Sequence, residues 1–408
     1  MWSGNVKTAL ANLRSSKTRS LLTMLGIIIG VSSVITVVSL GEGLKQRLVG
    51  QIRQIDPAVV IIRPGKLVDT AGTDKMNLNL LALLSPTTLT ENDVGALAKI
   101  PSVSTVVPLN FATNSLASDG RQLNNISVLG TTPSLTKVLD QKVERGAFFS
   151  EENEGEKLAV IGSDIAKQLF DGTNPIAHSI SIKGESFIVR GVLAPSPGGL
   201  LSIAQTDFNS VVYIPFNEAK KISGGQTNIL QILAGVRDGQ NIDVAVLDVK
   251  QTLLNSHGNQ DDFTVLKQRE LLKLANDTVG SAAGFITAIA AISLLVAGIG
   301  IMDIMLVSVS ERTREIGIRK AVGATNRQIL NQFLVEGMAL SVGGGIIGIT
   351  MALLIYFGLR LYTRLEPVLT APIMILAVVV SVVVGVIFSV APALKAARKD
   401  PIVALRGE

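Results

Sequence analysis

The sequence contains no cysteine, and this absence removes several kinds of chemistry at once. Disulfide bonds, thiol catalysis and zinc sites built on cysteine are all excluded. Only two histidines are present, His178 and His257, and they lie far apart in the sequence, so we expect neither to have a catalytic or metal-binding partner. Charged residues make up 17% of the 408 residues, which is less than a soluble enzyme of this size usually carries.

Sequence motifs for nucleotide, peptide and ester chemistry are also missing. There is no G-x-x-x-x-G-K phosphate loop, so we expect the chain to hydrolyse no ATP by itself. There is no H-E-x-x-H and no G-x-S-x-G. Residues 134–137 match S-x-x-K, but the companion S-D-N and K-T-G elements are absent, so we treat the match as chance. We therefore expect no catalytic residue, no metal site and no cofactor in this chain.

Basic residues are in excess, with a net charge of +5, but their placement argues against a nucleic-acid partner. They lie beside apolar segments, and no basic patch is interleaved with the aromatic side chains that stack on bases. Membrane lipid is the partner that this arrangement favours.

Apolar residues, at 47% of the chain, are concentrated in four blocks. The first, residues 21–40, has 20 residues and no charge, so as a helix it spans ~30 Å, the thickness of a bilayer core. A secretory signal peptide is the alternative, but its apolar region is normally shorter and precedes a small-residue cleavage site, so we favour a retained helix. The four expected membrane spans are residues 21–40, 279–310, 333–358 and 372–391.

Lysine and arginine are gathered in residues 1–20, which include Lys7 and Arg14, and in residues 311–332 and 392–408. The short connection between the third and fourth blocks holds only Arg360 and Arg364. Because short cytoplasmic flanks carry the excess of positive charge, these three segments are expected to face the cytoplasm. The protein is then a multi-pass protein of a bacterial-type plasma membrane, with both termini cytoplasmic and residues 41–278 outside.

The outer region has the pattern of an α+β domain. Its first piece reads as strand 59–62, helix 90–100 and strand 103–109, and its last piece as strand 231–236, helix 242–255 and strand 263–266. Between them, residues from about 125 to 215 are rich in short strands, with a helix over 163–170. Residues 41–55 and 266–278 are expected to be stalk helices, and residues 66–88 and 194–209 to be loops.

Glycines recur at a spacing of four inside the spans, a spacing that lets helix backbones approach closely. General enrichment of glycine in membrane helices explains the pattern equally well. The pairs are Gly26 with Gly30, Gly280 with Gly284, and Gly344 with Gly348.

The segment after the second span carries the strongest pattern. Residues 311–324 read as a charged amphipathic helix in which Glu311, Glu315 and Arg319 follow one another at four-residue spacing, so ion pairs can form along one face. A solvated helix that merely obeys the positive-inside rule is one interpretation. The other is a coupling helix, over residues 311–332, that docks into a cytoplasmic partner through Glu311, Arg314, Glu315, Ile316, Arg319 and Gly323.

Three blocks of the sequence resemble the permeases of MacB/FtsX-type ABC transporters. They are LLTMLGIIIGVSSVITVVSLGEG at the first span, GIGIMDIMLVSVSERTREIGIRKAVGAT running into QILNQFLVEG, and the tail PALKAARKDPIVALRGE. The resemblance covers the whole chain and implies a helical membrane protein with four transmembrane helices. It also implies an α+β extracytoplasmic domain, made of a porter-like subdomain with a strand-rich, Sabre-like insertion.

The resemblance also implies how such a chain works. Permeases of this family act as dimers, each copy bound to an ABC ATPase subunit that holds ATP and magnesium, in some cases with a membrane-fusion-type adaptor protein. Closure of the ATPases moves the outer domains, so the machine exports a substrate or transmits force. The alternative is an FtsX-like protein that activates a cell-wall hydrolase outside the cell. A membrane-tethered enzyme or receptor is a third class, for which the sequence offers no catalytic constellation.

Two acids lie within or beside the spans. Asp303 stands where relatives often have an uncharged polar residue, and an acid inside a span suggests either function or a partner. Asp303 is only two turns before Glu311, so we favour a position near the cytoplasmic headgroups. Glu336, at the start of the third span, matches a glutamate common in the family and leaves the same choice open.

Overall fold

The computed structural model describes residues 17–53, 55–69, 77–79, 87–118, 121–139, 141–153, 155–195, 208–362 and 367–406. Lys7, Arg14, Arg364 and much of the two expected loop segments lie outside the described residues. The chain divides into two compact units, each described by itself. The helical unit comprises Met1–Leu44 and Val279–Glu408, and the strand-rich unit is Lys45–Thr278.

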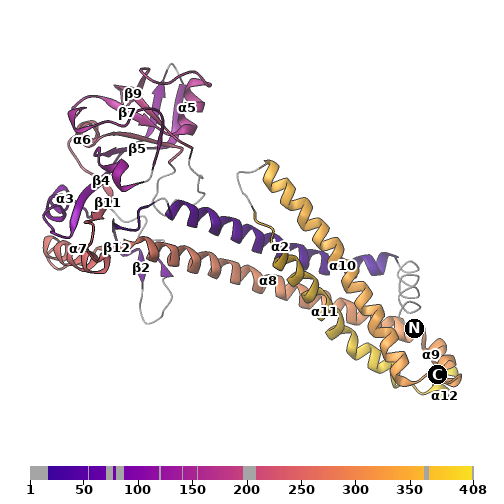
Figure 1. Cartoon of the computed structure of the whole chain (residues 1–408). Coiled ribbons are helices and arrows are strands. Elements are labelled where there is room, and N and C mark those ends of the chain that lie inside the picture. The colour runs from indigo at the N-terminus through magenta and orange to yellow at the C-terminus, as the bar shows by residue number, and fades with distance from the viewer. Residues whose placement is uncertain are drawn as a thin grey trace. The chain divides into compact units, whose positions relative to one another are not determined.

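Four helices among the described residues are long and apolar enough to cross a membrane. They are α2 (Lys17–Ile52), α8 (Gln268–Glu311), α10 (Asn326–Tyr362) and α11 (Ala371–Ala397) (Figure 1). Two short helices, α9 (Thr313–Ala321) and α12 (Pro401–Arg406), lie side by side at the end of the helical unit that holds the C-terminus (Figure 1).

These helices are longer than the apolar blocks suggested. With 44 residues, α8 is about 66 Å long, more than twice the bilayer core, and it includes the expected second span and the expected stalk from residue 268 onward, whereas residues 266 and 267 belong to a strand. Helix α10 begins at Asn326 rather than 333, and α11 continues to Ala397 rather than 391. Polar and charged residues extend these helices because helical backbone hydrogen bonds do not depend on apolarity, which marks only the part suited to lipid.

The strand-rich unit is built on a single ten-stranded sheet with the order β12-β1-β11-β4-β5-β10-β7-β9-β6, in which β8 pairs with both β4 and β9. Its strands are β1 (Val59–Pro64), β4 (Val103–Ser118), β5 (Arg121–Thr131), β6 (Val143–Gly146), β7 (Leu158–Ile161), β8 (Ser179–Ile182), β9 (Glu185–Leu193), β10 (Val211–Pro215), β11 (Ile229–Val236) and β12 (Phe263–Lys267). A separate pair is formed by β2 (Val68–Asp69) and β3 (Asn77–Leu78).

Two apolar cores can be traced among the described residues of this unit, and other buried side chains, such as Ile61, Leu109 and Tyr213, lie outside both. In the first, α3 (Glu91–Leu97) and α7 (Ile242–Ser256) pack on the strands β12, β1, β11 and β4, as Figure 1 shows, and Leu97 and Val249 are fully buried there. In the second, α5 (Ser163–Phe170) and α6 (Phe216–Ile222) share a core with β4, β5, β7, β8, β9 and β10, in which Phe187 is fully buried. Two small helices, α4 (Leu135–Val138) and the 3₁₀ helix η2 (Glu151–Asn153), complete the unit.

The expected boundary between the two pieces falls inside an element. The first piece was expected to end with a strand at 109, but β4 continues to Ser118 and pairs with β5 along most of its length. The two pieces therefore share one continuous sheet. The insertion of about 125–215 begins within β5. Strand β4 contributes to both cores, with Val103 in the first and Ala112 and Leu116 in the second.

Candidate functional site

The connection between α8 and α10 forms the candidate site, and it is not one helix. The helix expected over residues 311–332 is divided, because α8 ends at Glu311, α9 covers Thr313–Ala321, and Asn326 already belongs to α10. A reciprocal capping arrangement starts α10. The Thr325 N–H donates to Oε1 of Gln328 at 2.8 Å, and the Gln328 N–H donates to Oγ1 of Thr325 at 3.3 Å. The T-x-x-Q spacing was the sequence signal for this boundary.

Gly323 ends α9. Its φ of 107° lies in the left-handed region that favours glycine. The Gly323 N–H donates to the Lys320 carbonyl at 3.0 Å, and the Ala324 N–H donates to the Arg319 carbonyl at 2.9 Å. These two bonds are those of a Schellman motif, which satisfies the last carbonyls of a helix.

Ile316 and Gly317 face inward, so Ile316 does not lie on the exposed side of α9 and could only support a contact there from beneath. Ile316 is only 2% exposed and belongs to the apolar core of the helical unit together with Ile329 and Phe333. A Cβ on Gly317 would lie 2.8 Å from Cβ of Ala404 in α12, so this glycine allows two helices of the same chain to pack closely. The sequence pattern placed Ile316 on a docking face because it could not show that α12 and α10 cover this side of α9.

The outward side of the connection is mixed in character. Glu311, Arg314 and Glu315 are exposed, as predicted for docking residues. Two apolar side chains that sequence reasoning missed are exposed beside them, Ile318 at 48% and Val322 at 85%. Apolar residues on an otherwise charged helix, at positions 318 and 322, were the available signal. An exposed apolar pair flanked by charges is typical of an interaction surface.

Arg319 binds within the chain. Its Nη1 donates to Oε1 of Gln332 in α10 at 2.6 Å, and its Nη2 pairs with Glu315 one turn earlier. Arg319 therefore joins α9 to α10 and orients Glu315, rather than standing free on the surface.

Two more cations attach this connection to neighbouring helices. Arg312, between α8 and α9, forms an ion pair with the buried Glu336 of α10, with Nη1 3.4 Å from Oε1. Lys320 donates from Nζ to the carbonyls of Ala397 at 2.6 Å and Lys399 at 2.8 Å. Of the two choices left open for Glu336, the structure shows an acid inside the protein with a defined partner.

The glycine pairs of the spans lie at helix contacts within the helical unit. A Cβ on Gly26 would be 2.7 Å from Cβ of Ala297, and one on Gly30 would be 2.7 Å from Cδ2 of Leu294, so both let α2 approach α8.

The pair Gly344 and Gly348, in α10, also lies at a contact with α2. A Cβ on Gly344 would be 3.1 Å from Cβ of Ile27, and one on Gly348 would be 3.0 Å from Cβ of Val31. Gly280 and Gly284 differ, because a Cβ there would meet no described atom within 4 Å.

Asp303 is exposed on α8. No interaction joins it to another residue of the part of the chain that the structure describes. Eight residues, about 12 Å along a helix, separate it from Glu311 at the helix end. This distance is consistent with a position of Asp303 near the cytoplasmic headgroups.

The strand-rich unit contains a titratable cluster that the sequence did not reveal. His257, expected to lack a partner, is 2.6 Å from Asp262 through Nδ1 and 3.2 Å from Asp93 through Nε2. Asp93 also accepts hydrogen bonds from the backbone of Thr90, at 2.8 Å, and from Ser256. The cluster ties the start of α3, the end of α7 and the residues before β12 together. Asp93 and His257 are 164 residues apart in the chain, so sequence spacing could not show their contact.

The charge states of this cluster follow from opposing effects. Burial acts to lower the pKa of His257, but hydrogen bonds to Asp262 and Asp93 outweigh it, so the pKa is raised. Burial acts to raise the pKa of Asp93, but its hydrogen bonds with Ser256, Thr90 and His257 outweigh it, so the pKa is lowered. A protonated histidine between carboxylates is therefore favoured.

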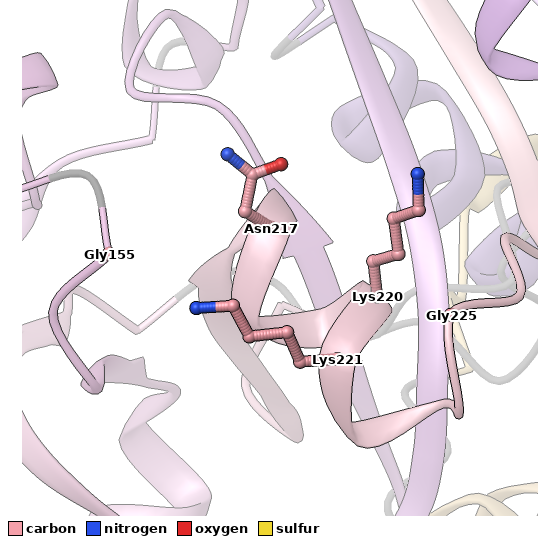
Figure 2. A pocket seen from close by; sticks show the side chains of 5 residues that line it. All are labelled: Gly155, Asn217, Lys220, Lys221 and Gly225. Atoms are coloured by element: carbon pink, nitrogen blue, oxygen red, sulfur yellow. The ribbon is translucent and has the colours of Figure 1, made fainter.

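A hollow of about 460 Å³ on the same unit is lined by Gly155, Asn217, Lys220, Lys221 and Gly225 (Figure 2). Its two lysines are both paired: Nζ of Lys220 is 2.6 Å from Oε1 of Glu91, and Nζ of Lys221 is 2.6 Å from Oε1 of Glu218. Figure 2 shows the two lysine side chains pointing in different directions. The hollow is therefore not a concentrated cationic site. Among the described residues, no group of three or more His, Cys, Asp or Glu could hold a metal ion.

Comparison with known families gives two matches along the chain. Residues 20–252 match the MacB-like periplasmic core domain, and residues 287–401 match the FtsX-like permease C-terminal domain. The first covers the strand-rich unit up to α7, and the second covers the α8–α10 connection and the helices around it.

Individual relatives agree with these matches. The chain is 36% identical over 409 residues to the macrolide export ATP-binding/permease protein MacB of Azoarcus sp. strain BH72, covering 98% of this chain but only 59% of that protein. It is 35% identical over 411 residues to the ABC transporter permease YknZ of Bacillus subtilis strain 168, covering 99% of both. The crystal structure of the periplasmic region of MacB from Actinobacillus actinomycetemcomitans aligns with 55% of this chain and 96% of that one, with 18% identity and a TM-score of 0.44.

Proposed function

We propose, from the premise that the chain belongs to the MacB/FtsX-type family of ABC transporter permeases, that it is the subunit through which a separate ATPase moves a domain outside the cytoplasm. The chain is a multi-pass membrane protein. Because it contains no phosphate loop, ATP and magnesium would be bound by the partner ATPase.

The observation that carries this proposal is the outward side of α9. Arg314, Glu315, Ile318 and Val322 present charge and apolar surface together on a helix whose other side is packed into the helical unit. A helix that only satisfied the positive-inside rule would not need exposed Ile318 and Val322. We assign to this surface the docking of the ABC ATPase, with Glu311 at its edge.

The path from the docking surface outward runs along α8. This helix is continuous from Gln268 to Glu311, and Arg312 joins its end to α10 through Glu336. A displacement of α9 would therefore move α8 and α10 together, and α8 would carry the movement towards residues 268–278. The strand-rich unit is the part that we propose to be moved.

The arrangement in the cell follows from the charge distribution. Residues 311–332 and the termini would face the cytoplasm, and residues 45–278 would lie outside it. Two copies of the chain would assemble with two ATPase subunits, and a membrane-fusion-type adaptor is a further candidate partner. The broad exposed face of α8, with Phe285 at 75% and Ile289 at 63% exposure, is available for lipid or for the second copy.

Export is the favoured output. The relatives include a protein named for macrolide export, and the match to the MacB-like periplasmic core covers residues 20–252. Activation of a cell-wall hydrolase, the FtsX-like alternative, would use the same movement with a different partner outside.

The test uses the ABC ATPase that co-purifies with the tagged full-length chain from its native host. Glu315→Arg and Val322→Asp should each reduce co-purification and stimulated ATP hydrolysis at least fivefold. The first reverses a charge in the interface, and the second buries a carboxylate there. Arg360→Glu is the matched control, since Arg360 is exposed at the opposite end of α10 and its charge is reversed in the same way. If both docking variants behave like the control, α9 is not the docking surface.

A further inference from the structure

Lys320 makes a contact that neither the sequence pattern nor the docking surface requires. Its Nζ donates to the carbonyl of Ala397, the last residue of α11, and to that of Lys399, in the short link before α12. Carbonyls at a helix end lack a partner within the helix, and the negative end of the helix dipole attracts a cation. Lys320 thus caps α11 from another helix.

Chain connectivity makes this contact important. Helix α9 is joined through the backbone to α8 at Arg312 and to α10 at residues 322–325. It has no such link to α11, because the chain reaches α11 only from the other end of α10, after Tyr362. Movement of α9 can therefore reach α11 by two routes: indirectly through α10, which packs along α11 and whose Ser341 carbonyl accepts a hydrogen bond from Oγ of Ser381 at 2.6 Å, and directly through the side-chain contacts near Ala397.

Helix α12 packs against the same helix, α9, near Lys320. Gly317 brings α9 within close contact of Ala404, and the carbonyl of Pro401 would lie 3.4 Å from a Cβ at Gly317. Lys320 binds the link between α11 and α12, so the three elements meet at one residue. Side-by-side packing of α9 and α12 is visible in Figure 1.

We propose that Lys320 is a positioning residue that makes α11 and α12 move with α9 when the ATPase acts. This inference rests on the proposed docking of the ATPase at α9. It adds the fourth membrane helix to the moving parts, whereas backbone connections alone would move α8 and α10. Lys320 itself is not assigned to the docking surface.

The experiment separates docking from transmission in the full-length chain bound to its ATPase. Lys320→Met removes both donors, and it should leave co-purification of the ATPase at the wild-type level while reducing stimulated hydrolysis at least fivefold. Lys320→Arg keeps a cation with several donors and should restore most of the stimulation. Lys395→Met is the matched control, because Lys395 is an exposed lysine of α11 that forms no hydrogen bond or ion pair with any other described residue, and it should leave both readouts unchanged.

A distance measurement tests the movement directly. Spin labels at Arg327→Cys in α10 and Ile402→Cys in α12, both exposed, report the separation of the two helices without and with trapped ATP. In the wild type, the distribution should be the same in both states. In Lys320→Met it should shift or broaden when ATP is bound. Lys320→Gln, whose side chain is shorter and uncharged, is read in the same way if Lys320→Met does not survive purification.

The outcomes are distinct. If Glu315→Arg releases the ATPase but the Lys320 variants match the wild type in hydrolysis and in the distance distribution, the role of Lys320 is wrong and the proposed function stands. Loss of ATPase co-purification in Lys320→Met with an intact fold would also overturn it, since Lys320 would then belong to docking. If Glu315→Arg and Val322→Asp have no effect, the proposed function itself fails.

Discussion

Nη1 of Arg312 lies 3.4 Å from Oε1 of Glu336, and this ion pair joins the break between α8 and α9 to the first part of α10. Glu336 is 7% exposed and thus depends on its partner. Because the break is where a movement would pass from one helix to the next, the pair holds the connection in one geometry.

Removing one member of this pair should destabilise the helical unit. Arg312→Met removes this ion pair from a buried carboxylate, and we expect a loss of ~2 kcal/mol, below the values for fully buried pairs because Arg312 still reaches solvent. The thermal unfolding temperature of the chain in detergent measures this. Exchange of the two residues, Arg312→Glu with Glu336→Arg, should recover part of the loss. No recovery in the exchanged variant, beside a clear loss in Arg312→Met, would show that the pair is not the source of the stability.

The glycines that separate α2 from its neighbours should not tolerate larger residues. Gly26→Val and Gly344→Val would each force a side chain against an adjacent helix, at a cost of about 1–3 kcal/mol for an overpacked core. Gly284→Val is the control, because a Cβ there meets no described atom within 4 Å. Yield and unfolding temperature in detergent provide the measurement, and equal behaviour of the three variants would mean that glycine enrichment, not packing, explains the pattern.

The His257 cluster predicts how stability of the strand-rich unit depends on pH. His257 has a raised pKa, so its contribution is full below about 6.5 and is lost as pH rises through the folded-state value. Asp93 has a lowered pKa, so its contribution is full above its ordinary value and is lost as pH falls through the folded-state value. We therefore expect α3 and α7 to become less protected as pH rises from 6 to 8.5.

Hydrogen–deuterium exchange of the full-length chain, corrected for intrinsic exchange rates, measures this protection. His257→Gln should abolish the pH dependence and lower protection at pH 6, by about 1–3 kcal/mol for a buried carboxylate that loses a hydrogen bond. His178→Gln is the control, since His178 is exposed. A pH dependence that survives in His257→Gln would assign it to other groups.

Topology can be tested without background, because the chain has no cysteine. In intact cells, an impermeant thiol reagent that reaches the outer face of the membrane should label Asp238→Cys and spare Val322→Cys, both exposed positions. After the cells are opened, the reagent should label both positions. Asp303→Cys should then also be labelled, as Val322→Cys is, if residue 303 lies near the cytoplasmic headgroups. Labelling of Val322→Cys but not Asp238→Cys in intact cells would reverse the orientation.

The sequence by itself determined the number and order of the membrane helices and the type of the outer domain. Four long apolar blocks with few charges indicate spans, because a helix satisfies its own backbone hydrogen bonds in lipid. Local rules also placed the helix α5 over residues 163–170 and the N-cap of α3 at Thr90, since capping and periodicity act between residues close in sequence.

Only the tertiary structure decided which side of α9 is free and which residues hold it. Ile316 has the helical spacing of a docking residue, but it is buried in the core of the helical unit with Ile329 and Phe333 of α10, whereas Val322 is exposed. The contacts of Lys320 with residues 397 and 399 and of His257 with Asp93 join positions from 77 to 164 residues apart. Sequence periodicity reports which face of a helix is apolar, but the partner that covers a face is set by packing between distant segments.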